Sequence, residues 1–205
     1  MTSRKSTAGA RAPQRKRGHE RVAVLLDTAA AYFVEKGYDA ATMTEIAARA
    51  GASIGSLYQF FPTKEALALA LLDRYARTLY AQMDALAGQL PDRDIGRLAA
   101  RLSGLLVEFR RHHPTFAALA EAVNSLPSRH SRKIRRELRR RLAALLALYA
   151  PRLDNTMLQA AAVVTLQWMK AAVALEAEPG LRGRDAVLAQ LRLALRLYLD
   201  TALKA

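Results

Sequence analysis

GYDAATMTEIAARAGASIGSLYQFFPTKEAL, the stretch from Gly37 to Leu67, decides the fold because helix start and stop signals follow one another closely within it. Gly37 can adopt the left-handed conformation that closes a helix, and Lys36 before it suits the negative helix end. An apolar face at helical period precedes this stop and predicts a helix that packs on the elements behind it. That face consists of Val22, Leu25, Leu26, Ala29, Ala30 and Phe33.

Two short helices are predicted behind this stop. Thr42 and Glu45 have the spacing of a capping box, so the hydroxyl and the carboxylate can each accept a hydrogen bond from an amide at the start of a helix. Gly51 then supplies a turn, and Ser53 caps a second helix over residues 54–60. Two short helices joined by a glycine turn form a helix-turn-helix, which reads DNA with its second helix.

The second short helix is therefore the predicted recognition element. Ile54, Ser56 and Gln59 are expected to face outward, and Ile54 offers only an apolar contact to a base. Gly55 costs roughly 1 kcal/mol relative to alanine inside a helix, which is explained if the backbone must approach DNA closely. Tyr58 can offer its hydroxyl to a phosphate, and Lys64 at the next helix N-terminus is expected to hold a second phosphate.

Residues 37–64 resemble, nearly position by position, the DNA-binding domain of the TetR family of bacterial transcriptional regulators. The resemblance implies an all-helical homodimer and repression that a small molecule relieves. Ala52 departs from the valine that is more frequent in the family, which affects local packing only. By this resemblance, phosphate contacts fall on Thr42, Thr44, Ser53, Tyr58 and Lys64, and base contacts fall on Ile54, Gly55 and Ser56.

The fold class that we predict is all-α, with a three-helix helix-turn-helix domain over 19–66 and a helical ligand-binding and dimerisation domain over 67–205. A basic, disordered arm is predicted over 1–18. Helical periodicity and breakers predict further helices over 64–86, 94–112, 129–149, 155–176 and 185–203, with a short segment over 115–124 between the second and the third of these. The last two, joined by a short loop, are expected to pair with their symmetry mates as a four-helix bundle.

The net charge of +14 is concentrated in two segments. The arm carries Arg4, Lys5, Arg11, Arg15, Lys16 and Arg17 and no acid, whereas the helix-turn-helix is slightly acidic. We therefore expect the arm to supply much of the non-specific DNA affinity, in the adjacent minor groove; the alternative is a solubilising tail.

The second basic segment runs from Arg129 to Arg141 and contains eight Lys/Arg against one acid. Its basic residues lie mainly on one side of an amphipathic helix. A solvated face is the simplest interpretation. A nucleic-acid or anionic-membrane surface and an electropositive approach to an acidic ligand are the alternatives.

Candidates for an effector pocket are Phe109, His113, Phe116 and Trp168, because they combine bulk with polar edges. Ordinary core packing is the alternative for each. No catalytic motif, metal-ligand spacing or cofactor loop occurs, so neither an enzyme nor a metal or cofactor site is predicted.

The predicted partners are double-stranded operator DNA, a second copy of the chain and an unidentified small molecule. The apolar run 160–175 is interrupted by Gln167 and Lys170 and is too short to span a membrane, so we expect a buried helix and a cytoplasmic protein. The alternative function is a helical DNA-binding architectural or interaction protein without a ligand.

Overall fold

The computed structural model describes residues 11–90, 92–116, 119 and 129–204, and in these parts every regular element is a helix. The predicted all-α class is thus confirmed. Side chains are described from residue 17 onward, and in α7 from residue 132. The helices are α1 (Arg11–Ala40), α2 (Met43–Arg49), α3 (Ile54–Phe60), α4 (Lys64–Gln89), α5 (Ile95–His112), α7 (Arg129–Ala147), α8 (Asn155–Ala177) and α9 (Arg184–Ala202).

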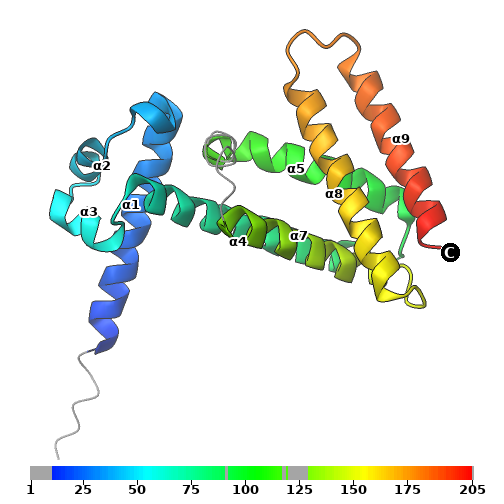
Figure 1. The fold of residues 1–205 in the computed structure, drawn as a ribbon, viewed down its shortest axis with the longest axis horizontal. Helices are drawn as coiled ribbons and strands as arrows, with labels where there is room; N and C mark the ends of the chain where they lie inside the picture. The colour runs from blue at the N-terminus through cyan, green and yellow to red at the C-terminus, as the bar shows by residue number, and fades with distance from the viewer. Residues whose placement is uncertain (1–10, 91, 117–118, 120–128, 205) are drawn as a thin grey trace, which may run out of the picture.

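The helices form two groups joined by α4 (Figure 1). Helices α1, α2 and α3 lie together at one end of the molecule, and α4 runs from them along α7. Helix α8 packs on α5, α7 and α9, so that α8 and α9 make an antiparallel pair at the other end. The first group is the predicted helix-turn-helix unit, and the second group contains the predicted effector and dimerisation region.

Helix α1 begins earlier than the sequence analysis expected. It starts at Arg11, so residues 11–18 of the predicted arm are helical, and only 1–10 lie outside the described residues. Arginine, lysine, glutamine and alanine are good helix formers, and Pro13 falls in the first turn, where its missing N–H has no helical acceptor. The prediction of disorder over 11–18 was therefore wrong.

Gly37 interrupts the last part of α1. Its φ of 78° and ψ of 160° lie in a region that essentially only glycine occupies. The predicted stop at Gly37 is thus confirmed as a break, and helical turns resume behind it to Ala40. This break directs the chain from α1 into α2.

One face of helix α4 is buried along its length. Leu67 and Leu71 are fully buried at its start, and Leu79, Met83 and Leu86 are at most 2% exposed further along. All five belong to one continuous apolar cluster, which also contains buried residues of α1, α5, α7, α8 and α9. The two groups of helices therefore share one core.

Two polar contacts join α1 to later parts of the chain. The Thr115 hydroxyl is buried and donates a hydrogen bond of 3.1 Å to the Ala30 carbonyl oxygen, across 85 residues of sequence. The Arg74 guanidinium of α4 lies 2.7 Å from the Asp27 carboxylate of α1. These contacts fix the direction in which α1 leaves the bundle.

Helix α7 is tied to α4 by charged side chains. Arg141 bonds the Asp84 carboxylate of α4, and its guanidinium lies 4.8 Å from the centre of the Tyr80 ring. Glu137 accepts hydrogen bonds from Arg140 and Arg141, and these two cations lower the pKa of its carboxyl to about 2. Two cations of the basic segment, Arg140 and Arg141, are thus paired with acids rather than merely solvated.

Helix α8 is the only helix in the described ranges that is long and apolar enough to cross a membrane. It contacts α5, α7 and α9, and Ala161, Ala162, Leu166 and Met169 on its inner face are at most 2% exposed. Packing within the bundle therefore accounts for the apolar character of this inner face.

Candidate DNA-reading surface and effector cavity

The start of α2 is capped by Thr42. Its hydroxyl oxygen accepts a hydrogen bond of 3.3 Å from the Glu45 amide and donates one of 2.5 Å to the Glu45 carboxylate. The predicted cap is confirmed, but the carboxylate bonds the hydroxyl rather than a second amide. Tyr32 also donates a hydrogen bond to Glu45, and both hydroxyls lower the pKa of this carboxyl.

The turn between α2 and α3 is a Schellman motif. The Gly51 amide donates to the Ala48 carbonyl oxygen at 3.1 Å, and the Ala52 amide donates to the Ala47 carbonyl oxygen at 3.0 Å. Gly51 has a φ of 61°, which its missing Cβ permits. The turn satisfies two carbonyl groups at the end of α2 and sets the direction of α3.

Helix α3 has one buried side and one open side. The Ser53 hydroxyl caps it by accepting a hydrogen bond of 3.2 Å from the Ser56 amide, and Leu57 is fully buried. The exposed fraction is 39% for Ile54 and 48% for Tyr58, whereas Ser56 is half-buried. The open side of α3 also presents Gly55, Gln59 and Phe60.

Gly55 is not needed for the fold. It lies within α3, is exposed, and a Cβ built on it would meet nothing within 4 Å. Alanine would therefore fit and would favour the helix by about 0.5–1 kcal/mol. The glycine leaves bare backbone on the open side of α3.

The cations near this surface are engaged within the protein. Arg49 of α2 makes a bidentate salt bridge to Glu35 of α1, and its guanidinium lies 4.2 Å from the centre of the Tyr32 ring. The hydrogen bond from Arg49 lowers the pKa of the Glu35 carboxyl, although both groups are exposed. Arg49 thus fixes α2 on α1.

Lys64 is engaged in the same way. Its Nζ donates hydrogen bonds to the carbonyl oxygens of Tyr38, Asp39 and Ala41 at 2.9, 2.9 and 3.0 Å. It also lies 4.8 Å from the centre of the Tyr38 ring. These bonds occupy the three protons of the ammonium group. Lys64 therefore closes the end of α1, and its predicted phosphate contact requires a phosphate oxygen to replace a carbonyl oxygen.

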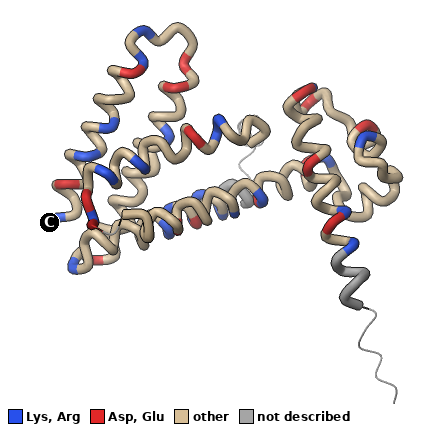
Figure 2. The backbone as a smooth tube through the Cα atoms, turned by 180° about the vertical axis from the view of Figure 1, so that it is seen from behind, with Lys and Arg blue, Asp and Glu red and all other residues tan. Residues whose placement is uncertain are grey.

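The other predicted contact residues are also exposed. Thr44 lies in the first turn of α2, and Ser53 is the N-cap of α3. Few Lys or Arg lie on these two helices, as Figure 2 shows. The predicted DNA surface therefore relies on hydroxyl and amide donors.

A cavity of about 500 Å³ lies among α4, α5, α7 and α8. Its walls are mainly apolar, and three cationic side chains reach it. Of the four predicted pocket residues, only Phe116 lines it. The lining includes the apolar Leu72, Leu79, Leu106, Leu138 and Leu166, and the cationic Arg110, Arg135 and Lys170.

The other predicted pocket residues lie beside the cavity. Phe109 is buried, with its ring centre 4.5 Å from that of His113 and 5.2 Å from that of Phe116. Burial lowers the pKa of His113, as do His112 and Arg74 nearby. Trp168 is half-buried outside the lining. These three residues therefore pack against their neighbours and do not line the cavity.

The sequence analysis missed Arg135 and Lys170 as cavity residues. Lys170 was treated only as an interruption of an apolar run, although it is the only Lys or Arg of α8. An isolated cation on an otherwise apolar helix was the available signal. Arg135 gave no such signal, because it is one of eight cations in its segment.

Comparison with known proteins identifies the family to which the chain belongs. The model of the tetR family of bacterial regulatory proteins matches residues 25–71, and a tetracyclin repressor-like C-terminal domain matches residues 94–199, more than half of the chain. The chain belongs to the TetR family. Members of the TetR family are transcriptional regulators rather than enzymes, and the two matched ranges cover both groups of helices.

Relatives within the TetR family match parts of the chain. The HTH-type transcriptional activator FasR of Mycolicibacterium smegmatis is 50% identical over 60 residues, which are 29% of this chain and 27% of that protein. The HTH-type transcriptional repressor KstR of the same organism is 34% identical over 86 residues, 41% of this chain and 42% of that protein. The matches therefore span less than half of these relatives.

Solved TetR-family structures share the fold over most of the chain. A regulator from Pectobacterium atrosepticum has a TM-score of 0.66 and 24% identity, covering 92% of this chain and 97% of that chain. FadR from Bacillus subtilis, in complex with stearoyl-CoA, has a TM-score of 0.62 and 15% identity, covering 84% and 96%. At these identities the likeness establishes the fold.

The role of Lys64 in closing α1 predicts a loss of stability on its removal. Lys64→Ala leaves three carbonyl groups without their charged donor and should lower the free energy of unfolding by about 1–2 kcal/mol. Urea denaturation measures this change. Lys36→Ala is the matched control, since Lys36 makes only an exposed contact of 3.7 Å to Glu35 and should cost no more than about 0.5 kcal/mol. Equal losses in the two variants would contradict this role.

Proposed function

We propose that the chain is a repressor that binds a near-palindromic operator as a homodimer and is released by a small molecule. The observation that carries the DNA-binding part is the open side of α3, where Gly55 leaves bare backbone that the fold does not require. A glycine that costs helix stability is explained when DNA approaches closely at this position.

The proposed base contacts come from the first turn of α3. Ile54 offers an apolar surface to a thymine methyl group, Gly55 admits the base edge, and Ser56 offers a hydroxyl. Because Ser56 is half-buried, we expect it to contribute least to the contact with the bases. Specificity therefore depends on shape and apolar contact more than on charged side chains.

The proposed phosphate contacts surround this turn. Thr44, Ser53 and Tyr58 are exposed and carry hydroxyl groups that can donate to phosphate oxygens. Thr42 and Lys64 join them by exchanging a bond within the protein for one to phosphate, at a smaller net gain. These contacts fix the position of α3 without reading sequence.

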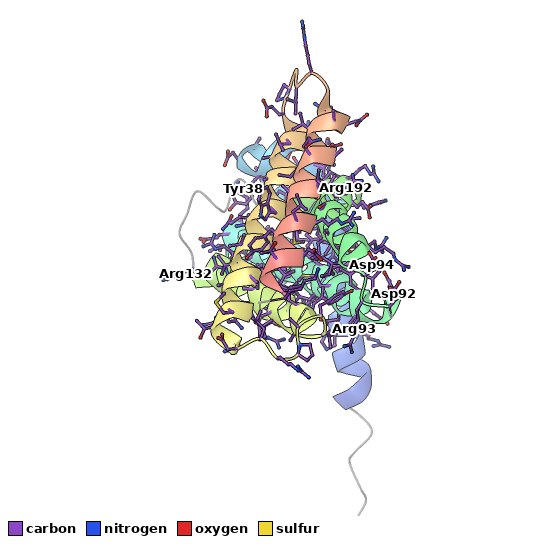
Figure 3. All side chains as sticks on the ribbon, turned by 90° about the vertical axis from the view of Figure 1, so that its right-hand side faces the viewer. Tyr38, Asp92, Arg93, Asp94, Arg132 and Arg192 are labelled. Atoms are coloured by element: carbon purple, nitrogen blue, oxygen red, sulfur yellow. The ribbon has the colours of Figure 1, made fainter. Side chains whose placement is uncertain are left out.

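The proposed dimer forms through α8 and α9. Both helices present large apolar side chains to solvent, which a second copy would cover. Figure 3 looks onto this pair, with Arg192 and Asp94 at one edge and Arg132 at the other. The exposed apolar side chains are Met157 and Val164 on α8 and Leu193 and Leu197 on α9.

Repression is favoured over activation on physical grounds. Occupying a promoter suffices to exclude polymerase, whereas activation needs a further surface that holds it. The cavity among α4, α5, α7 and α8 supports release by a small molecule, because α4 also enters the DNA-reading unit. A ligand acts by binding one spacing of the two α3 helices better than another. A cytoplasmic location follows from this role.

Selection of bound sequences from random duplex DNA tests the function. The purified chain should enrich a near-palindrome with half-sites about one helical turn apart. Gly55→Ala should weaken binding to that sequence at least about tenfold, because the added methyl group meets the DNA, while raising stability by about 0.5–1 kcal/mol.

Gly88→Ala is the matched control for this substitution. Gly88 is exposed in α4, and a Cβ there also meets nothing within 4 Å, so stability should rise without a change in DNA affinity. If Gly55→Ala binds the selected sequence as tightly as Gly88→Ala does, α3 does not read DNA in this way. Binding without an enriched sequence would favour an architectural protein.

The arm is tested by removing residues 1–10, which leaves α1 whole. If Arg4 and Lys5 contact phosphates, affinity should fall and its dependence on salt concentration should flatten, because fewer counterions are released. Fluorescence anisotropy with the selected duplex, measured at several salt concentrations, reports both. Identical curves for the two chains would exclude a contribution of Arg4 and Lys5 to DNA binding.

The dimer is tested by placing charge on its proposed face. Leu193→Glu with Leu197→Glu should shift the chain from dimer to monomer at micromolar concentration in sedimentation equilibrium, and should reduce operator affinity. Leu148→Glu changes an equally exposed leucine, 41% exposed outside α8 and α9, and should leave the dimer intact. A dimer that persists in the double variant would exclude this interface.

A further inference from the structure

The cavity has an uneven distribution of charge. Arg110 of α5, Arg135 of α7 and Lys170 of α8 reach it from three helices, and no described lining residue is acidic. An adjoining cleft is lined by Arg110 and by one described acidic residue, Glu176. Arg135 and Lys170 therefore define a positive end of the cavity that is separate from this cleft.

The positive charge of Lys170 is disfavoured by its surroundings. Lys170 is exposed, yet partial burial of its side chain lowers the pKa of its ammonium group, and the positive charges of Arg135 and Arg139 lower it further. Arg139 lies one turn along α7 from Arg135, and its Nε is buried without a hydrogen-bond partner in the described residues. Three cationic groups thus lie close enough together to repel one another.

The rest of the cavity is apolar. Leu72 and Leu79 of α4, Leu106 of α5 and Leu166 of α8 form walls that favour hydrocarbon over water. The volume of about 500 Å³ lies within the range of about 300–1,000 Å³ that is typical of small-molecule sites. One ligand can therefore meet both the positive end and the leucine walls.

We propose that the cavity binds an amphipathic anion, whose carboxylate or phosphate head lies against Arg135 and Lys170 and whose apolar body lies along the leucines. An anion relieves the mutual repulsion of these cations and forms charge-assisted hydrogen bonds with them at the edge of the apolar cavity. Lipophilic cations are disfavoured by the same charges, and neutral hydrocarbons leave the cations without a partner. This assignment rests on the proposed function for its regulatory meaning, but not for binding itself.

The experiment compares ligands that share a tail and differ in the head group. Dodecanoate, dodecyl phosphate, 1-dodecanol and dodecyltrimethylammonium are titrated into the full chain without DNA, below their micelle concentrations, by isothermal titration calorimetry. Dodecanoate or dodecyl phosphate should bind at least about tenfold more tightly than the alcohol, and the tighter of the two identifies the head group. Equal affinities across the heads, or tightest binding of the cation, would overturn the assignment.

Variants locate the head group. Arg135→Gln and, separately, Lys170→Met should each weaken binding of the anion about tenfold while leaving the alcohol unchanged. Arg136→Gln is the matched control, because Arg136 is exposed on the same helix and does not line the cavity. Circular dichroism establishes that each variant is folded. Anion affinity that is unchanged in both cavity variants would place the site elsewhere.

The two proposals can fail separately. If the anion binds with the expected head-group preference but leaves the selected duplex bound in an anisotropy assay, the cavity assignment stands and release by this ligand is wrong. If the chain selects an operator but no anion binds, the DNA-binding proposal stands and the cavity assignment is wrong.

Discussion

The burial of α4 is the constraint on which the rest of the structure depends. Its apolar residues complete the core beneath α2 and α3 at one end and the core beneath α5, α7 and α8 at the other. One helix with one continuous buried face cannot adjust to the two cores independently, because side chains in a packed interior resist small displacements. The position of the DNA-reading unit is therefore tied to the packing around the cavity.

The same constraint gives the cavity its importance. Leu72 and Leu79 face it from α4, so a ligand that enters touches the helix that supports α3. The cavity also brings the positive charges of Arg135 and Lys170 together beside apolar walls, and an anion would offset their mutual repulsion. Packing places the ligand next to α4, and electrostatics decides which ligand is held there. In the proposed function, binding of an effector changes DNA binding only if the ligand both contacts α4 and is held by the cavity's charge.

Signals that act within a few residues were predictable from the sequence. The Ser53 cap, the Gly51 turn and the break at Gly37 each depend on one residue and its immediate neighbours. The sequence analysis predicted only a phosphate contact for Lys64, because the carbonyl groups that it bonds lie 23 to 26 residues away along the chain. Arg135 and Lys170 face one cavity through tertiary packing of α7 on α8, which periodicity along one helix does not reveal. The size of a side chain did not predict which residues line the cavity, since Phe109 and Trp168 pack beside it.

The shared core also bears on the order in which the chain folds as it is synthesised. Leu67, Ala68 and Leu71 are fully buried, and α1 contacts α4. When residue 66 has emerged from the ribosome, α1, α2 and α3 are complete, yet these three side chains of their core are missing. The core of the DNA-reading unit is complete only when the first two turns of α4 have been added. Until then, the apolar surface that these side chains cover stays exposed on the nascent chain.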